Sequence, residues 1–563
     1  MPDPDLVAVL EEDLSLPRAL CSLLVARGYH DPDAAKAFLR PSLSALNPPE
    51  ALDDIPVAVR RIMTALEARE TIFVHGDYDV DGMAGTALLT RWLRRLGGTV
   101  VPFVPHRVLN GYDLGTAGLE AAVQAGASLI VTVDCGILAY GALAEARRLE
   151  MDVIVTDHHT PGGELPPALA VLNPNRVDGS YPDRGLCGAA VVFKLCQALA
   201  HARGLSQEEL HPLLDLVGMA TIADLVPLTG ENRILARFGL RALARTGNLG
   251  LRALMAHAGV GPHQLSAGTV GFVLAPRLNA VGRLGDASRG LRLLLTEDQG
   301  EADRLAREAG ELNQERQEED RRILGEAVSR LADGYDPERD FGVVLESDGW
   351  HPGVIGIVAS RVAELVHRPT VLVSLQGDRG RGSGRSIPQF HLLEGIRACS
   401  IHLERFGGHR QAAGLEIRRS NLSGFREAFN AEARRALEHQ ELRPTLRLEA
   451  EVRLEDLSWD LHNYLKYFGP HGMGNPRPIF VARGVSLARP GRVVGSHHLK
   501  LHLRQGDAEL EAIGFRLAQR LPPEALGQGP LDVAFQLQEN EYRGTRHLQA
   551  NIKDIRPSEG VET

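Results

Sequence analysis

The sequence has few cysteines and no long apolar run. Its five cysteines include no Cys-x-x-Cys pair, which argues against a zinc ribbon, and their odd number and wide spacing predict reduced thiols. No apolar run reaches the roughly 18 residues of a membrane span, and the acidic first residues lack the pattern of a secretory signal. We therefore expect a soluble, cytoplasmic protein with no membrane contact.

A net positive charge is also absent. The formal charge is −10, whereas proteins that bind polyanions in bulk are usually basic. A site built from carboxylates can nevertheless coexist with basic grooves, so net charge alone does not decide against nucleic acid. The 563 residues are too many for one core and predict about three to four domains, and the 44 % hydrophobic and 24 % charged residues are typical of a globular protein.

The pattern along the chain predicts two α/β units and a β-rich C-terminal part. Between residues 71 and 156, apolar runs alternate with helical segments, which favours a parallel sheet with helices on both faces. A long, charged, helix-prone stretch follows, and we interpret it as a solvated connecting helix. After Pro444, short β-rich segments separated by polar turns predict a small barrel. The expected parts are an N-terminal helical segment (1–50), a first α/β domain (51–295), a connecting helix (296–335), a second α/β domain (336–440) and the barrel (445–560).

An acidic turn, His75-Gly76-Asp77-Tyr78-Asp79-Val80-Asp81-Gly82, follows the first apolar run. Read alone, it is an exposed acidic turn, a calcium loop or a site for hard divalent cations. An EF-hand would need a Glu six residues after the glycine and a helix before the loop, whereas Leu88 and a β-rich run stand there.

Three apolar runs end in residues that can bind metal: His75, Asp134 and Asp157, the last followed by His158 and His159. Ligands of parallel sheets lie beyond the carboxyl ends of the strands, so these side chains are expected at one edge. Taken by itself, Asp134 would be interpreted as a turn residue. Asp224 follows a helical stretch and, taken by itself, would be interpreted as a helix cap. Together they predict a site for two metals, which can clamp the attacking and leaving oxygens of a phosphoryl displacement. Asp77 and Asp157 are the candidates to orient histidine ligands through the free ring N–H.

These segments, with Ala223-Asp224-Leu225-Val226-Pro227, resemble the four motifs of the DHH phosphoesterases. Three later segments are similar to the RecJ branch of that family, whose members are exonucleases specific for single-stranded DNA: Ala275 to Leu284, Trp350 to Gly356 and Phe406 to Gly414. The segment around Phe468-Gly469-Pro470 and the β-rich tail resemble that branch's oligonucleotide-binding barrel. The resemblance covers residues 50–555.

The resemblance implies the following roles. One metal is held by His75 and Asp79, the other by Asp81, His158 and Asp224, with Asp134 bridging the two and His159 beside the scissile phosphate. Asp134, His159, Asp77 and Asp157 form the expected catalytic set. The metals are Mn²⁺ or Mg²⁺, and the mixed Asp/His set suits Mn²⁺ somewhat better.

Two glycine-rich segments of the second α/β domain carry phosphate-type donors, because glycine lets backbone N–H groups approach an anion and arginine adds a bidentate donor. Either segment alone reads as an ordinary turn. Together they predict a substrate clamp in which Ser383 and Arg385 receive the terminal phosphate and His409, beside Gly407 and Gly408, contacts the scissile group. Arg277 and Asn279 are further candidates for phosphate contact, although Arg277 could equally form a surface salt bridge.

The barrel contains a local basic run from which Arg492, Lys500 and Arg504 are expected to contact nucleic acid. Aromatic residues for base stacking are sparse there, and a lysine-bearing edge strand is the alternative.

The expected function is a single-stranded-DNA-specific exonuclease that acts in repair and recombination. The 5′-to-3′ polarity, the release of 5′-mononucleotides and the possible partners, a helicase and a single-strand-binding protein, are implied by resemblance alone. A monomer is expected. The alternatives are a phosphodiesterase for short oligonucleotides or small phosphoesters, which would not need the barrel, and an inactive DNA-binding scaffold, which would not need the full ligand set.

Overall fold

A five-stranded, all-parallel sheet forms the centre of the first lobe in the computed structural model, which describes residues 2–107, 109–526, 529–542 and 544–558. The strand order is β2-β1-β3-β4-β5. The strands are β1 (Thr71–Gly76), β2 (Thr99–Phe103), β3 (Ala127–Val133), β4 (Asp152–Thr156) and β5 (Ala170–Leu172). The four apolar runs of the sequence are β1 to β4, and the three-residue β5 is too short to have been predicted from its pattern.

Helices cover both faces of this sheet, as the apolar strands require. Ile72 and Val74 of β1 point into the core formed with α4, α5, α8 and α9, whereas Phe73 points to the opposite face, under α6 and α7. These helices are α4 (Ile55–Ala68), α5 (Val80–Arg95), α6 (Thr116–Gln124), α7 (Tyr140–Arg148), α8 (Gly188–Ala202) and α9 (Leu214–Ala223).

The rest of the first lobe is helical and lies against α5 and α9. It consists of α10 (Gly230–Leu243), α11 (Leu249–His257), α12 (Ala267–Thr269), the π-turn η5 (Val270–Leu274), α13 (Ala275–Leu284) and α14 (Ala287–Leu295). Short 3-10 turns elsewhere in the chain are η1 (Leu43–Ala45), η2 (Pro49–Ala51), η3 (Gln207–Leu213), η4 (Pro262–Gln264), η6 (Ser400–His402), η7 (Arg419–Asn421), η8 (Leu454–Asp456), η9 (Lys466–Phe468), η10 (Leu517–Gln519) and η11 (Pro523–Leu526).

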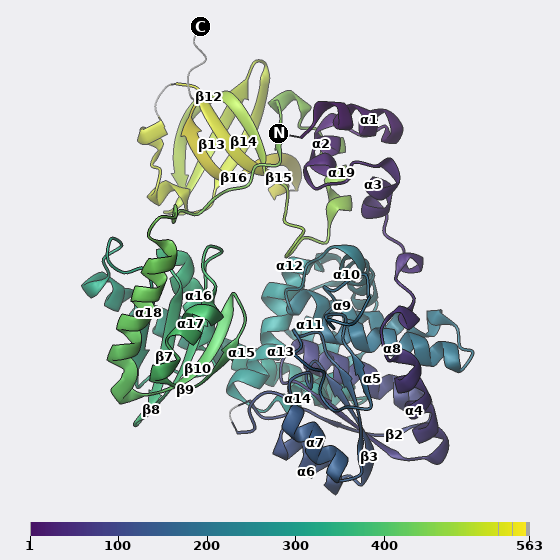
Figure 1. The fold of residues 1–563 in the computed structure, drawn as a ribbon. Coiled ribbons are helices and arrows are strands. Elements are labelled where there is room, and N and C mark those ends of the chain that lie inside the picture. The colour runs from purple at the N-terminus through teal and green to yellow at the C-terminus, as the bar shows by residue number, and fades with distance from the viewer. Residues whose placement is uncertain (1, 108, 527–528, 543, 559–563) are drawn as a thin grey trace.

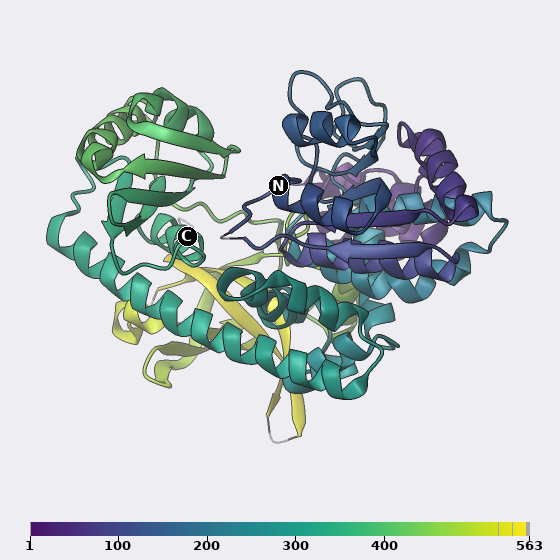
Figure 2. The same ribbon diagram turned by 90° about the horizontal axis from the view of Figure 1, so that it is seen from below.

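The connecting helix α15 (Gln299–Gly334) joins the two α/β lobes and is part of both cores (Figure 2). Leu305 and Ala309 pack into the first lobe, and Ile323 and Ala327 pack into the second. The helix is therefore solvated only on its outer side, and its recurring apolar positions anchor it at both ends.

The second lobe has a mixed five-stranded sheet in the order β6-β7-β8-β10-β9. Helices α17 and α18 cover one face, and α16 covers part of the other. The elements are β6 (Val343–Ser347), α16 (Ile355–Val366), β7 (Thr370–Gln376), β8 (Arg379–Arg385), α17 (Leu392–Ala398), β9 (Leu403–Gly408), β10 (Ala412–Arg418) and α18 (Leu422–Leu437).

The C-terminal part is a closed β-barrel. Its strands follow the order β11-β12-β13-β14-β16-β15, and an additional pairing of β12 with β15 closes the sheet. The elements are β11 (Ala450–Glu451), α19 (Trp459–Leu465), β12 (Phe480–Val494), β13 (His498–Gln505), β14 (Ala508–Gly514), β15 (Leu531–Tyr542) and β16 (Thr545–Pro557).

The N-terminal helices share one hydrophobic core with the barrel, although about 400 residues separate them in sequence. They are α1 (Pro4–Leu14), α2 (Arg18–Ala26) and α3 (Pro32–Leu39). Leu20 and Leu24 of α2 lie in the same core as Phe468 and Phe535 of the C-terminal part. We call this assembly the barrel unit, and it lies above the first lobe in Figure 1.

All five cysteines are free and buried. Within the described residues, no helix is long and apolar enough to cross a membrane.

Candidate metal centre and substrate cleft

The acidic loop between β1 and α5 is shaped by its own side chains. Asp79 is the N-cap of α5, and its Oδ1 accepts hydrogen bonds from the amides of Asp81 (2.9 Å) and Gly82 (3.1 Å). A Cβ on Gly82 would lie 2.5 Å from the backbone of Asp77, so only glycine allows the loop to fold this tightly. The loop thereby brings Asp77, Asp79 and Asp81 to the carboxyl edge of the sheet.

Asp81 is fixed by the start of α8. Its Oδ2 accepts from the amide of Gly188 (2.6 Å) and its Oδ1 from the amide of Ala189 (2.8 Å). The positive end of a helix stabilises a carboxylate, so the anion is held in place although it is buried.

Asp134 follows β3 with a left-handed backbone, φ 61°. A Cβ on Gly188 would lie 2.6 Å from the Asp134 Cβ, so α8 approaches this residue as closely as glycine permits. A non-glycine residue in this conformation is strained, and such strain is concentrated at functional sites.

Asp157, which follows β4, uses its whole carboxylate to orient the histidines after it. Its Oδ1 accepts from the His158 amide (2.7 Å), the His159 amide (3.0 Å) and His159 Nδ1 (2.8 Å), and its Oδ2 accepts from the Ile137 amide (3.0 Å). With these N–H donors in place, Asp157 positions the two histidines.

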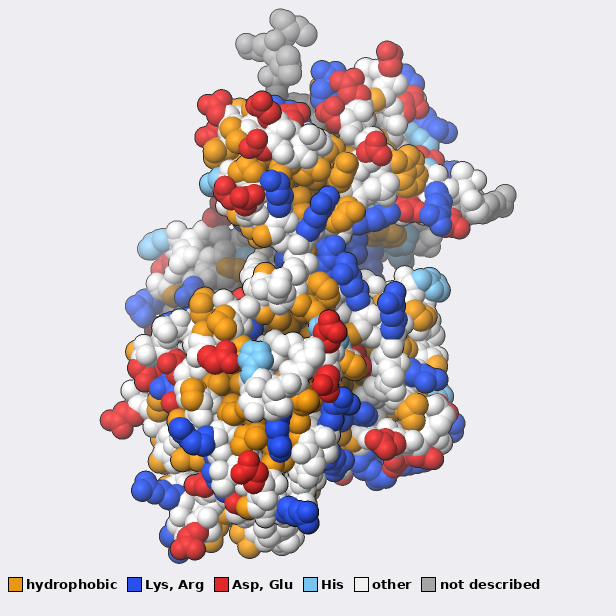
Figure 3. Space-filling model, turned by 90° about the vertical axis from the view of Figure 1, so that its right-hand side faces the viewer, with side chains coloured by type: hydrophobic (Ala, Val, Ile, Leu, Met, Phe, Trp, Pro, Cys, Tyr) orange, Lys and Arg blue, Asp and Glu red, His pale blue; other side chains and the backbone are white. Residues whose placement is uncertain are grey.

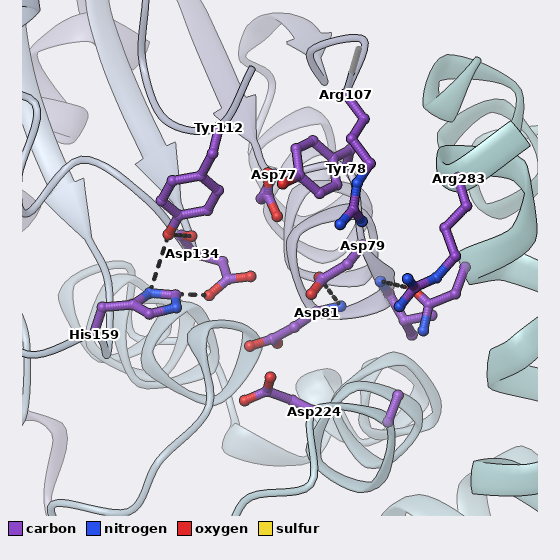
Figure 4. A pocket seen from close by; sticks show the side chains of 13 residues that line it. Asp77, Tyr78, Asp79, Asp81, Arg107, Tyr112, Asp134, His159, Asp224 and Arg283 are labelled. Carbon is purple, nitrogen blue, oxygen red and sulfur yellow. Dashed lines mark hydrogen bonds and ion pairs between the residues drawn. The ribbon is translucent and has the colours of Figure 1, made fainter. Parts of the chain in front are cut away.

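Ligand-type atoms gather in three overlapping groups, one of which, Asp134 with His158 and His159, shares residues with two others that have no residue in common. In one of these two, His158 Nε2 lies 3.5 Å from Asp224 Oδ2 and 3.8 Å from Asp81 Oδ2. In the other, oxygens of Asp77, Asp79 and Asp134 lie within 4.8 Å of one another. Asp134 connects the groups, because its Oδ1 lies 3.1 Å from His158 Nε2. Figure 4 shows Asp134 facing Asp81 and Asp224 across the site.

Burial and mutual repulsion disturb the protonation of these groups. Burial and the neighbouring carboxylates raise the pKa of Asp77, Asp134 and Asp224 well above the ordinary value. Burial and Asp79 raise the pKa of Asp81 to about 7. Burial and the neighbouring His159 lower the pKa of His158 to about 4, which keeps its imidazole neutral and able to bind metal.

His159 differs from its neighbour. Burial alone would lower its pKa, but the hydrogen bond and charge of Asp157 raise it to about 9. The same contact keeps the pKa of Asp157 low despite its burial. At neutral pH His159 is therefore a cation held beside the metal-type groups.

The donor set fits divalent cations. Asp77 Oδ1, Asp134 Oδ1 and His158 Nε2 are buried and have no hydrogen-bond partner among the described residues. Ligand atoms about 2.1 Å from a metal in octahedral geometry are about 3.0 Å apart, close to the 3.1 Å between Asp134 Oδ1 and His158 Nε2. A cation would also relieve the repulsion between the carboxylates. Oxygen and imidazole donors suit Mn²⁺ and Mg²⁺.

His75 lies differently from the expected arrangement. Its ring is fully buried, with Nδ1 3.6 Å from Cys135 Sγ and Nε2 against Gly118 of α6. His75 is in neither group, and Asp77, which was expected to orient a histidine, lies instead with Asp79 and Asp134. The reason is strand alternation: His75 follows Phe73 to the α6 face of the sheet.

The two groups open into a cavity of about 320 Å³ that several residues not predicted from the sequence also line. Tyr112 Oη donates to the Asp134 carbonyl (3.1 Å) and lies 3.2 Å from His159 Nδ1. The Arg107 guanidinium lies 4.8 Å from the centre of the Tyr78 ring (Figure 4). Both Arg107 and Tyr112 follow β2, whose carboxyl end lies at the same edge of the sheet. Because ligands of parallel sheets bind beyond the carboxyl ends of the strands, the sequence could have indicated this loop.

Ser383 and Arg385 stand on a strand rather than a turn. In β8, whose sequence is Arg-Gly-Arg-Gly-Ser-Gly-Arg, the glycines pack closely on the core and the polar side chains share the opposite face. Arg385 Nη1 donates to Ser383 Oγ (3.1 Å), and both side chains lie against Gly356 in the first turn of α16.

Arg385 lies toward the first lobe. Burial lowers the pKa of the Arg385 guanidinium, and the nearby charge of Arg107 lowers it further. Burial, Arg107 and Arg385 also act on Arg283, which lines the cavity and whose pKa falls to about 10. Three arginines from three elements thus lie close enough for their charges to lower the pKa of Arg283 and of Arg385, and none of the three forms a salt bridge within the described part of the chain, an arrangement that suits a phosphate.

Gly407, Gly408 and His409 form the β9–β10 hairpin. The His409 amide donates to the Ala412 carbonyl (2.8 Å), and Gly408 has φ 140°, where a Cβ would meet the Ala412 carbonyl oxygen at 2.4 Å. Burial lowers the pKa of His409, and the charges of Arg385 and His159 lower it further, which places this hairpin near both lobes' functional groups.

The other predicted substrate contacts have partners within the protein. Asn279 Oδ1 accepts from the Val80 amide (3.2 Å) and so fixes the start of α5, while Arg277 donates to the Val273 carbonyl. In the barrel, Lys500 pairs with Glu511 (3.2 Å) and Arg504 with Glu509 (2.5 Å), whereas Arg492 stands opposite Lys500 on β12.

Comparison with protein families finds three matches in chain order. Residues 71–221 match the N-terminal domain of the DHH family, residues 340–435 match the DHHA1 domain, and residues 448–554 match the RecJ OB domain. The three matches lie in the first lobe, the second lobe and the barrel, and the first covers the sheet and the helices from α5 up to α9.

Curated proteins and solved structures resemble the chain over nearly its whole length. The single-stranded-DNA-specific exonuclease RecJ of Dickeya dadantii is 37 % identical, with 96 % of each chain covered. The protein of the same name from Escherichia coli is 35 % identical, again with 96 % of each chain covered. The crystal structure of RecJ in complex with Mn²⁺ from Thermus thermophilus has a TM-score of 0.84 and 32 % identity, and the match covers 100 % of this chain and 79 % of that one.

Proposed function

Because the chain belongs to the RecJ branch of the DHH family, we propose that it degrades single-stranded DNA from the 5′ end and releases 5′-mononucleotides by metal-dependent hydrolysis. The observation that carries this proposal is the pair of adjacent ligand groups connected by Asp134 at one side of a cavity. Two such groups match the arrangement that phosphodiester hydrolysis by two cations requires.

Asp81, His158 and Asp224 would hold one divalent cation, Asp79 and Asp77 the other, and Asp134 would contact both. When bound, Mn²⁺ or Mg²⁺ would supply an activated water and neutralise charge on the phosphate. His75, expected from the resemblance to be a ligand, is proposed as a further ligand of the second cation, since its buried Nε2 has no hydrogen-bond partner among the described residues.

The chain's own side chains would orient the scissile phosphate. His159, kept cationic by Asp157, would donate from Nε2 to a non-bridging phosphate oxygen. Tyr112 would support this ring at the same nitrogen that contacts Asp157, since its Oη lies 3.2 Å from Nδ1.

Ser383, Arg385, Arg107 and Arg283 would bind the terminal 5′-phosphate, and His409 would reach the scissile group from the second lobe. Donors on a rigid strand and at the start of a helix fix the terminal phosphate relative to the metals. A terminal-phosphate site of this kind would account for the release of one nucleotide at a time from a phosphorylated end.

The alternatives are less well supported. A phosphodiesterase for short oligonucleotides or small phosphoesters would not need a barrel, and the barrel here is closed and fixed to the first lobe. A scaffold without activity would not need buried, unpaired metal-type atoms.

We also propose a cytoplasmic monomer that acts in DNA repair and recombination, together with a helicase that opens duplex DNA and a single-strand-binding protein. The five free cysteines suit a reducing compartment. The need for such partners follows from the substrate, since a cleft that accepts only single strands depends on another protein to open duplex DNA.

In the barrel, Arg492 has the best access to the DNA backbone, because Lys500 and Arg504 are engaged with glutamates.

The test is the Asp134→Asn variant, which keeps the shape of the side chain and removes its charge. We expect Mn²⁺-dependent release of nucleotides from end-labelled single strands to fall by at least about a thousandfold, since metal-mediated charge stabilisation is lost. Binding of the same strands in EDTA should stay close to that of the wild type. Substantial remaining nuclease activity would contradict the role of Asp134, and release from the 3′ end would contradict the polarity.

A further inference from the structure

A short turn after the edge strand β5 lies against the two histidines that follow β4. It contains Asn173, Pro174 and Asn175, and Asn173 is only 1 % exposed. Strand β5 pairs with β4 in parallel, and the Asp157 amide donates to the Leu172 carbonyl (3.1 Å). The turn therefore begins directly beside the metal-type residues.

Each asparagine donates to the backbone of one histidine. Asn175 Nδ2 donates to the His158 carbonyl (2.6 Å), and Asn173 Nδ2 donates to the His159 carbonyl (2.9 Å). Asn173 Oδ1 accepts from the Asn175 amide (2.7 Å), which couples the two residues across Pro174. Asparagine suits such a turn, because its oxygen can accept from the backbone two residues further on while its NH₂ group still donates.

The turn is itself anchored to the first lobe through Arg176, which is only 8 % exposed. Arg176 Nη1 donates to the Val171 carbonyl (3.1 Å) and to Asp54 Oδ2 (2.7 Å). The same Asp54 oxygen accepts from the Val171 amide (3.0 Å). The two asparagines therefore donate from a fixed support rather than from a free loop.

The histidines depend on this support because they lie outside regular secondary structure. Residues 157–160 form neither helix nor strand, so their carbonyls are not fixed by a regular ladder of backbone hydrogen bonds. Asp157 holds the amides of His158 and His159, and the asparagines hold the carbonyls of the same two residues. The peptide groups on both sides of each histidine are thus held, which fixes the direction in which each imidazole leaves the backbone.

We propose that Asn173 and Asn175 are positioning residues with separate tasks. Asn175 sets the imidazole of His158 for the cation, and Asn173 sets the imidazole of His159 for the scissile phosphate. This inference rests on the proposed function, in which His158 is a metal ligand and His159 contacts the phosphate.

The tasks are separate because the two asparagines hold different peptide groups. Asn175 holds the peptide between the two histidines, whereas Asn173 holds only the peptide after His159. Loss of the Asn173 donor is therefore expected to leave His158 in place. A group that orients a metal ligand changes the affinity for the metal, and a misplaced donor to a reacting group lowers the rate of the reaction.

The experiment compares Asn175→Ala, Asn173→Ser and the matched control Asn248→Ala in the whole chain. Serine at position 173 keeps an oxygen that can accept from the Asn175 amide, but it is too short to reach the His159 carbonyl. Asn248 is also buried, and its Nδ2 donates to the Leu294 carbonyl (2.9 Å) outside the lining of the cavity. Mn²⁺ binding is measured by isothermal titration calorimetry without DNA, and kcat and KM are measured on a 5′-phosphorylated single strand at saturating Mn²⁺.

Asn175→Ala should weaken Mn²⁺ binding by about tenfold or more, and saturating Mn²⁺ should restore most of its kcat. Asn173→Ser should bind Mn²⁺ as the wild type does but should lower kcat by about tenfold or more with little change in KM. Asn248→Ala should lower the melting temperature without changing Mn²⁺ affinity or kcat, because its hydrogen bond serves stability alone.

Wild-type Mn²⁺ affinity in Asn175→Ala, or wild-type kcat in Asn173→Ser, would overturn the proposal. Equal weakening of Mn²⁺ binding in both variants would overturn the separation of tasks, and the same changes in Asn248→Ala would reduce them to lost stability. Asn175 is only partly buried, so its variant tests the metal-directed task independently of the buried position 173. Because calorimetry needs no nuclease activity, a wild type that binds Mn²⁺ but degrades no single strand would overturn the proposed function instead.

Discussion

Arg233 fixes the barrel unit to the first lobe, and its removal should separate the degradation of long single strands, which depends on this joint, from the cleavage of dinucleotides, which does not. It lies on α10, is only 2 % exposed and donates to the carbonyls of Phe38 (3.1 Å), Tyr467 (2.7 Å) and Phe468 (2.7 Å). Its guanidinium also lies 4.0 Å from the centre of the Phe38 ring. Figure 3 shows Lys and Arg side chains gathered where the barrel unit meets the first lobe.

Arg233→Ala should destabilise this joint by about 2–4 kcal/mol. The Phe38 carbonyl loses its donor, and an unpaired buried polar group costs about 1–3 kcal/mol, whereas the Phe468 carbonyl still accepts from Asn475 Nδ2 (2.8 Å) and the Tyr467 carbonyl from Arg237 Nη1 (3.4 Å). The contact between the guanidinium and the Phe38 ring is lost as well. A looser barrel unit lowers the effective concentration of bound DNA at the metals, so kcat/KM on long single strands should fall at least about tenfold. A dinucleotide reaches the metals without the barrel and should be cleaved at nearly the wild-type rate.

The assay compares long single strands with a dinucleotide and follows unfolding by thermal melts and limited proteolysis. Arg241→Ala, two turns further along α10 and exposed, is the matched control and should change neither measurement. Arg233→Lys should be intermediate, because an ammonium group keeps the charge but lacks the planar fork that spans several carbonyls. An Arg233→Ala protein that melts within about 1 kcal/mol of the wild type, or that loses both activities equally, would refute this account of the joint.

Two further predictions concern the phosphate donors and the metal centre. Arg385→Ala should reduce the preference for 5′-phosphorylated over 5′-hydroxyl strands by roughly tenfold or more, the value of one charge-assisted hydrogen-bond pair, whereas an unchanged preference in a competition assay would exclude Arg385 from the terminal-phosphate site. In the metal-free protein, burial and Asp79 raise the pKa of Asp81 to about 7, well above its ordinary value, so the folded state binds the extra proton and loses stability as the pH rises through that window. The increase in melting temperature on adding saturating Mn²⁺ should therefore grow between about pH 5 and pH 8 in thermal-shift measurements, and an increase independent of pH would contradict this coupling.

Much of the architecture could be predicted because it depends on local patterns. Four apolar runs separated by helical segments indicated the parallel sheet, and the carboxyl-edge rule brought Asp134, Asp157 and the two histidines to one place. The pattern of apolar and β-rich segments also indicated the second lobe and the barrel, which the family matches and the solved RecJ structures confirm.

The features that the sequence did not predict depend on the direction in which side chains point and on contacts between segments that are far apart in the chain. Alternation along β1 places His75 on the α6 face, where its buried Nε2 has no hydrogen-bond partner among the described residues, so its role as a metal ligand stays a prediction. Tyr112 and Arg107 reach the cavity from an irregular loop, where no periodicity fixes the direction of a side chain. The glycine-rich segment with Ser383 reads as a turn, but its glycines alternate and pack a strand closely on the core.

The core shared by the N-terminal helices and the barrel has a consequence for the order in which the protein can fold. The helices α1 to α3 are synthesised first, but the strands that cover Leu20 and Leu24 begin only at Ala450, about 410 residues after α3 ends at Leu39. At roughly 5–20 residues per second, the ribosome needs about 20–80 s to deliver them. During that time both α/β lobes can fold, while the apolar face of α1 to α3 stays exposed because the barrel strands have not yet been made. The barrel unit therefore closes last, and the nascent N-terminus is the part of this chain with the greatest need for chaperone protection.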